Sequence, residues 1–118
     1  MSQALYEQAR AAFLSFPEAV ETITWGEPHF RVANKIFGGY GEKDGRASIG
    51  FKLTMPHAEA AIAADSRFSK APYVGNKGWV NLEINPQTDW GEVKKLIEIS
   101  YRLIAPKKLV RLLDRPQK

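Results

Sequence analysis

The segment at residues 44–53 reads DGRASIGFKL, and its pattern decides the fold. The Asp44-Gly45 pair is a strong signal for a two-residue hairpin turn. After this turn apolar residues recur at every second position, at Ala47, Ile49, Phe51 and Leu53, with Ser48, Gly50 and Lys52 between them. A period of two predicts a strand with one apolar face and one open face.

The residues before this segment extend the same pattern towards the N-terminus. Phe30 and Val32 alternate with Arg31, and Ala33-Asn34 can turn the chain before Ile36-Phe37 restarts a strand. The pair Gly38-Gly39 within that strand predicts a bulge or a close approach of another part of the chain. Together these segments indicate a meander of antiparallel strands.

Helical patterns flank the meander. Apolar residues at 5, 9, 12, 13 and 16 predict an amphipathic helix closed by Pro17, and a turn-rich stretch follows up to residue 28. We expect a short helix at 56–64, a long loop at 65–77 and a strand carrying Val80, Leu82 and Ile84. Asp89 and Glu92 resemble a capping box. The helix after it carries its apolar stripe at Val93, Leu96, Ile97, Tyr101 and Ile104, and a last helix covers 107–113.

These elements predict an α+β fold, a twisted antiparallel sheet with helices packed on one face. We expect one domain over residues 1–113 and a polar tail over 114–118. The 118 residues include no cysteine, which excludes disulfides and thiolate sites. There is no signal-peptide pattern and no apolar run of the roughly 20 residues that a membrane span needs. A cytoplasmic protein without membrane association follows, with a monomer as the default.

Charge is distributed unevenly along the chain. Residues 1–60 carry six Lys/Arg against seven Asp/Glu, whereas residues 61–118 carry eleven against six. The two halves therefore differ in net charge, −1 against +5, within a total of +4. A basic half indicates a polyanion partner such as DNA, although a solvated basic surface gives the same composition.

The usual signatures of catalysis are missing from the sequence. His29 and His57 are far apart with no carboxylate cluster beside them, so a zinc site is not expected. The serines lie outside a Gly-x-Ser-x-Gly elbow. Residues 39–44 begin like a dinucleotide fingerprint but lead into a strand. We therefore predict a non-enzymatic protein without cofactor or metal.

The most unusual stretch lies before the last strand and reads YVGNKGW at residues 73–79. Aromatic rings interleaved with lysine suit stacking on bases and pairing with phosphates. The alternative is structural, with Gly75 and Gly78 supplying positive φ in a tight connection while Tyr73 and Trp79 anchor the core. Asn76 and Lys77 are the pair for which we favour an exposed, functional role.

Several short elements appear in a characteristic order over about residues 13–109: ETITWG at 21–26, FRVANKIF at 30–37, YVGNKGWV at 73–80, and the pairs Leu96-Ile97 and Ser100-Tyr101. In these elements the sequence resembles the MmcQ/YjbR-like family. Some members have His-Met-Asn-Lys and His-Trp in the third block. Because this chain has glycine there, no role of those histidines transfers to Gly75 or Gly78.

The resemblance implies a CyaY-like fold and the description usually given to the family, a DNA-binding protein with a "double wing" of hairpins. It brings no catalytic residues. Iron binding of the frataxin kind needs clustered carboxylates, and the first helix offers only Glu7.

The leading hypothesis is therefore a nucleic-acid-binding domain, with DNA as its partner, that works largely through phosphate contacts. Its candidate residues are Arg46, Lys52, Arg67, Lys70, Asn76 and Lys77. The alternative is a protein- or small-ligand-binding module that uses Trp25, Tyr73 and Trp79 as an aromatic pocket.

Overall fold

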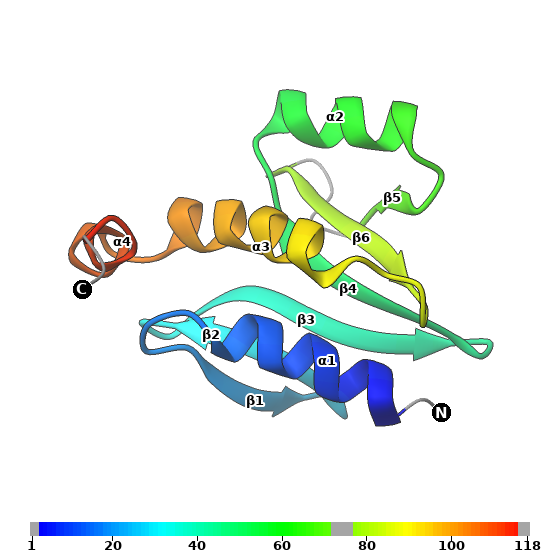
Figure 1. The fold of residues 1–118 in the computed structure, drawn as a ribbon, viewed down its shortest axis with the longest axis horizontal. Coiled ribbons are helices and arrows are strands. Elements are labelled where there is room, and N and C mark those ends of the chain that lie inside the picture. The colour runs from blue at the N-terminus through cyan, green and yellow to red at the C-terminus, as the bar shows by residue number, and fades with distance from the viewer. Residues whose placement is uncertain (1–2, 72–76, 116–118) are drawn as a thin grey trace.

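The computed structural model describes residues 3–71 and 77–115 (Figure 1). Along the chain it contains α1 (Gln3–Leu14), β1 (Val20–Thr24), β2 (Glu27–Val32), β3 (Lys35–Lys43), β4 (Arg46–Lys52), α2 (Met55–Ala64), β5 (Phe68–Lys70), β6 (Trp79–Ile84), α3 (Trp90–Ile104) and α4 (Lys107–Leu113). The strands form one antiparallel sheet in the order β1-β2-β3-β4-β6-β5. The predicted α+β class is confirmed.

The first four strands are joined by three turns of the same kind. Trp25-Gly26, Ala33-Asn34 and Asp44-Gly45 each place two successive residues at positive φ. This is the type I′ geometry, whose twist matches that of the strands it joins. The turns predicted at Ala33-Asn34 and Asp44-Gly45 are confirmed.

Two short strands differ from expectation. The stretch before residue 28, predicted as turn-rich, contains β1 and the start of β2, and the loop predicted at 65–77 contains β5. β1 lies at the edge of the sheet with Val20 and Ile23 exposed, so it lacks the apolar alternation of a half-buried strand. β5 has only three residues and buries only Phe68, which leaves no period to recognise.

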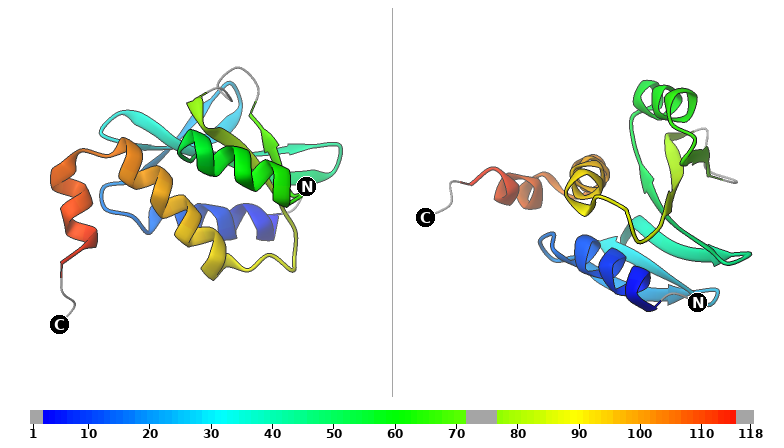
Figure 2. Two further views of the ribbon diagram at one scale, coloured as in Figure 1. Left: turned by 90° about the horizontal axis from the view of Figure 1, so that it is seen from above. Right: turned by 45° about the vertical axis from the view of Figure 1, so that its right-hand side comes forward.

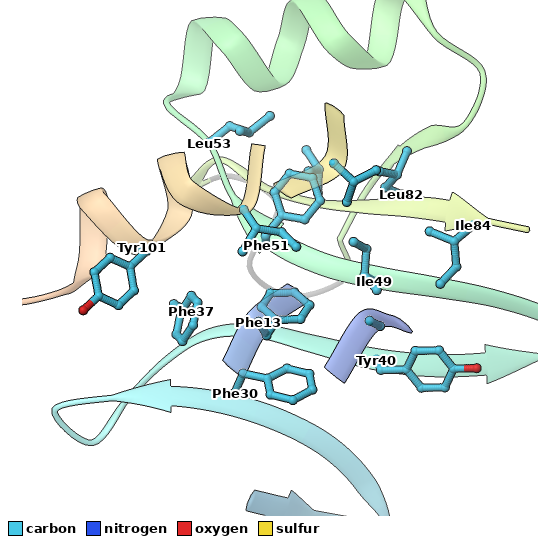
Figure 3. Close-up of a cluster of buried hydrophobic side chains, with 14 of the residues drawn as sticks. Phe13, Phe30, Phe37, Tyr40, Ile49, Phe51, Leu53, Leu82, Ile84 and Tyr101 are labelled. Atoms are coloured by element: carbon cyan, nitrogen blue, oxygen red, sulfur yellow. The ribbon is translucent and has the colours of Figure 1, made fainter. Parts of the chain in front are cut away.

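α1, α2 and α3 lie on one face of this sheet, with α1 and α3 side by side, and α4 extends beyond the sheet from the end of α3 (Figure 2). The core fills the space between the sheet and the helices (Figure 3). The strands contribute Phe30, Phe37, Ile49 and Phe51, and the helices contribute Phe13 and Tyr101. Asp89 caps α3 by accepting hydrogen bonds from the backbone N–H groups of Gly91 and Glu92. Glu92 pairs with Arg67, which departs from the reciprocal bond of a capping box.

Gly38 is the point at which α1 comes closest to the sheet. A Cβ atom at this position would lie 1.9 Å from Cε1 of Phe13. The Phe13 ring stacks on Phe30 with 4.5 Å between centroids and is fully buried. The expected close approach at Gly38-Gly39 is therefore confirmed, and only a residue without a side chain allows it.

Phe37, the neighbour of Gly38, is an extra residue in the sheet. Phe30 pairs with Gly38 and Arg31 pairs with Ile36, so Phe37 has no opposite residue on β2 and forms a bulge. On the other side, the β3–β4 ladder stops at Gly38 and Phe51. The next rung would join Phe37 to Lys52.

The hydroxyl of Ser100 occupies the place of that missing rung. The backbone N–H of Lys52 donates to Ser100 Oγ at 2.9 Å, and this hydroxyl donates to the carbonyl of Phe37 at 2.7 Å. Ser100 is fully buried. One α3 side chain thus satisfies two backbone groups at the point where β3 and β4 separate (Figure 1).

No helix among the described residues is long and apolar enough to cross a membrane.

Gly38→Ala is expected to destabilise the protein by about 1–3 kcal/mol, because the added methyl group overlaps the Phe13 ring. Urea unfolding followed by tryptophan fluorescence measures the change. In the matched double variant Phe13→Leu/Gly38→Ala, part of the cost of the alanine should disappear, since the smaller side chain leaves room for it. Substitutions that disturb no contact usually change the free energy of unfolding by less than about 0.5 kcal/mol. A change within that range for Gly38→Ala alone would show that the contact is absent.

Ser100→Ala is expected to cost about 1–3 kcal/mol, since it leaves the Lys52 N–H and the Phe37 carbonyl without their shared partner. The amide hydrogen of Lys52 should also exchange faster than in the unmodified protein. Ser69→Ala, an exposed serine on β5, serves as the control and should be almost neutral. Unchanged exchange at Lys52 would contradict the bridge.

Candidate functional site

The face of the sheet opposite α1 and α3 carries polar and small residues. Residues paired across neighbouring strands share a face, so the register defines rows that run across the sheet. One row runs from β1 to β5 through Thr22, His29, Gly39, Gly50, Asn81 and Ser69. The next row contains Thr24 and Glu27 on β1 and β2, and continues with Gly41, Ser48 and Glu83 on β3, β4 and β6. Gly39 and Gly41 therefore leave the middle of this open face without side chains.

A hollow of about 650 Å³ lies over these glycines. Gly39, Gly41 and Gly50 contribute to its floor, and Trp25 and Trp79 also line it. Its size is typical of ligand pockets, which range over roughly 300–1,000 Å³. The hollow is present because two adjacent strands, β3 and β4, place glycine at these positions, where side chains of other residues would fill the space.

Polar side chains lie over the glycines on the floor. The His29 ring would be 3.2 Å from a Cβ at Gly39, the Glu27 carboxylate 2.9 Å from one at Gly41, and the Asn81 amide oxygen 3.2 Å from one at Gly50. Each of these side chains thus occupies room that the adjacent glycine leaves. The arrangement brings three hydrogen-bonding groups from β2 and β6 towards the centre of the hollow.

The surroundings of the His29 ring favour one tautomer of its neutral form. Its Nδ1 lies 3.1 Å from the backbone carbonyl of Glu27, and a carbonyl can only accept a hydrogen bond. The neutral ring therefore carries its proton on Nδ1 and leaves Nε2 as an acceptor. Nε2 lies 3.6 Å from the position of a Cβ at Gly39, above the floor of the hollow.

Trp25 stands at one end of the hollow in an unusual conformation. It is the first residue of its type I′ turn, has φ of +51°, and exposes 97% of its surface. Positive φ is unfavourable for a bulky residue, and burial does not compensate for it here. A large ring kept at this position without contributing to the core points to a role in binding.

Trp79 stands at the diagonally opposite corner. Trp79 is half-buried, is the first residue of β6 and pairs with Lys52 of β4. Trp25 precedes β2, which lies three strands away from β6 in the sheet. From strand spacing and rise per residue, the two backbone positions are roughly 20 Å apart. This distance suits an elongated ligand better than a single ring. The Trp79 ring belongs to the open face, which answers the alternative that it anchors the core.

Gly78, next to Trp79, has the structural role expected of it. Its φ is +91°, and a Cβ there would lie 2.0 Å from the carbonyl oxygen of Leu53. Its own carbonyl accepts a hydrogen bond from Leu53 N–H at 2.9 Å. This contact holds the start of β6 against the end of β4 and thereby positions Trp79. The other residues of the aromatic and lysine-containing block that we singled out, Tyr73, Gly75 and Asn76, lie outside the described residues.

The cations predicted to contact phosphates are spread over different surfaces. Arg46 and Lys52 lie on the open face, and Arg46 is 4.0 Å from Glu83. Lys70 is exposed but pairs with Val80, so its side chain leaves from the helix-covered side of β5. Lys77 is exposed in the turn before β6. Arg31 and Lys43 add two further cations to the open face.

Arg67 is engaged in ion pairs with neighbouring carboxylates. Its guanidinium contacts Asp65 at 2.7 Å and Glu92 at 3.3 Å. Hydrogen bonds from Arg67 lower the pKa of the Asp65 carboxyl group, and the same bonds raise the pKa of Arg67. Its positive charge is thus balanced locally, which makes it the least available of the predicted phosphate contacts.

The sequence interpretation missed the polar floor of the hollow. Glu27, His29 and Asn81 had not been connected with each other, because β2 and β6 are far apart in sequence and the pairing of β4 with β6 is not visible there. One signal was present. Gly39, Gly41 and Gly50 all fall on outward positions of adjacent strands, and together they predict a gap in one face. Among the described residues, no cluster of three or more His, Cys, Asp or Glu side chains could hold a metal ion.

Comparison with known proteins identifies the family. The YjbR family model matches residues 14–103. The chain belongs to the YjbR family. The expected resemblance is therefore confirmed over most of the domain.

Solved structures share the fold of this YjbR chain. A Deinococcus radiodurans protein, DR2400, with a DUF419 domain, superposes with a TM-score of 0.73 at 16% identity, covering 94% of this chain and 88% of that one. A Pseudomonas syringae protein gives 0.64 at 15% identity, covering 87% and 98%. No curated protein matches the sequence.

Trp25→Asn is expected to raise the free energy of unfolding by about 1 kcal/mol, because asparagine tolerates the turn conformation that strains tryptophan. Ala33→Asn, at the equivalent position of the next turn, is the matched comparison and should behave similarly. Urea unfolding measures both. A loss above 1 kcal/mol for Trp25→Asn alone would mean that the ring stabilises the fold after all.

Proposed function

We propose that this domain is a non-enzymatic nucleic-acid-binding protein that holds a single-stranded segment of DNA along the open face of its sheet. The observation that carries this proposal is the pair of tryptophans at opposite ends of one hollow. Bases stack on exposed aromatic rings with little dependence on sequence, and an extended strand can reach both rings. Family membership is compatible with this function but does not imply it.

Cations on the same face supply the phosphate contacts. Arg31, Lys43 and Lys52 point outward from β2, β3 and β4, around the part of the face where the tryptophans lie. Lysine and arginine contacts to phosphates position a strand without reading its sequence. The proposal thus moves most of the binding from the loop lysines to the open face, with Lys77 as an outer contact, and it does not include Lys70, whose side chain leaves from the helix-covered side.

Stacking on both rings can be tested with a labelled single-stranded octamer in fluorescence anisotropy. Trp25→Ala and Trp79→Ala should each weaken binding about tenfold, within the range of about 1–3 kcal/mol per stacked base. Trp90→Phe changes the remaining tryptophan, the first residue of α3, which packs against the core, and should leave affinity unchanged. Binding that is equal in all three variants would overturn the stacking role.

The same assay separates phosphate contacts from stacking. Affinity should fall steeply between about 50 and 200 mM salt, because bound cations on the nucleic acid are released. Lys43→Glu should weaken binding, whereas Lys107→Glu on the distant α4 should not. Duplex DNA, whose bases are already stacked on one another, should bind more weakly than the single strand. Absence of binding at low salt would overturn the proposed function.

A second candidate function is the binding of a small molecule in the hollow, favoured by the size of the hollow. It predicts thermal stabilisation by the ligand with little dependence on salt. Nucleoside monophosphates are suitable first probes, since they carry a single base and cannot span both tryptophans.

A further inference from the structure

We infer that the floor of the hollow discriminates between bases, and that it favours bases with an exocyclic amino group over thymine and uracil. The inference rests on the proposed function and deepens it. The tryptophans supply affinity that any base can use, so discrimination has to come from the polar groups between them.

The groups on the floor are predominantly hydrogen-bond acceptors. In the neutral His29 ring, Nε2 is an acceptor when Nδ1 donates to the nearby Glu27 carbonyl. The carboxylate of Glu27 can only accept, and the oxygen of the Asn81 amide is the atom that lies over Gly50. Three acceptors from two strands therefore face the space above the glycines.

The geometry keeps these acceptors within reach of one flat group. Gly39 and Gly50 are directly paired, so positions above them are about 5 Å apart. His29 leans over the first glycine from β2 and Asn81 leans over the second from β6. A base that rests on this floor would meet the polar groups of both side chains.

Base chemistry then determines the preference. Cytosine presents an N4 amino group and adenine an N6 amino group, whereas thymine presents a carbonyl oxygen at the corresponding position. An amino group can donate to the Glu27 carboxylate or to His29 Nε2. A carbonyl oxygen in the same place would face acceptors, leave them unpaired and be repelled by the carboxylate.

The decisive comparison is between oligo-dC and oligo-dT, because both are pyrimidines of similar size. Cytosine has an amino group and an acceptor N3 where thymine has a carbonyl group and an N3–H, and thymine also carries a C5 methyl group. Octamers of each are titrated by anisotropy at one fixed salt concentration. We expect oligo-dC to bind about tenfold more tightly, within the range of about 1–3 kcal/mol for a well-placed base contact. An equal affinity, within twofold, overturns the inference while leaving the proposed function intact. Failure of both octamers to bind at low salt overturns both.

Glu27→Gln tests the residue that contributes the charge. The amide can donate to a carbonyl, so oligo-dT should bind more tightly and the preference should shrink to about threefold or less. Glu27 is exposed, and the change removes no contact with the core. Glu83→Gln is the matched control, a carboxylate on the same face that pairs with Arg46. A preference that is unaffected by Glu27→Gln, or reduced equally by Glu83→Gln, rules out selection by the floor.

Discussion

The hydroxyl of Ser100 stands where the β3–β4 ladder would have its next rung, and much of the fold depends on it. It joins α3 to the carbonyl of Phe37 and to the N–H of Lys52. Phe37 is also the extra residue of the bulge towards β2, and its ring packs against Phe16 and Tyr101. Without an α3 side chain at this place, two buried backbone groups would lose their partner just where the central strands separate.

The neighbouring pair Gly38-Gly39 connects this core to the open face. Successive residues of a strand point to opposite faces. Gly38 therefore makes room for Phe13 on the helix side, and Gly39 makes room for His29 on the other. Neither could carry a side chain without displacing an aromatic ring or closing the hollow. One short segment of β3 thus meets the requirements of the core and of the candidate site together.

The sequence predicts this fold well where the pattern is local. The alternation of residues 47–53 and the turns at Ala33-Asn34 and Asp44-Gly45 appear as expected, because neighbouring residues determine them. The turn at Trp25-Gly26 falls within the stretch predicted as turn-rich, whereas β1 in the same stretch was missed because an exposed edge strand lacks the apolar alternation. An aromatic pocket of Trp25, Tyr73 and Trp79 was proposed from the sequence; Trp25 and Trp79 line one hollow, and Tyr73 lies outside the described residues. Glu27, His29 and Asn81 could not be connected, because only the register across four strands brings them together.

If the open face binds a single strand as proposed, its distribution of charge would allow stacking and phosphate binding to coexist with selectivity. A floor made of cations would attract phosphates into the hollow and leave the bases outside. Here the cations Arg31, Lys43 and Lys52 surround a floor that carries the Glu27 carboxylate, which repels phosphate. A single strand is therefore best accommodated with its backbone towards the cations and its bases towards the glycines. In this orientation the bases, and not the backbone, meet the acceptors that can distinguish between them.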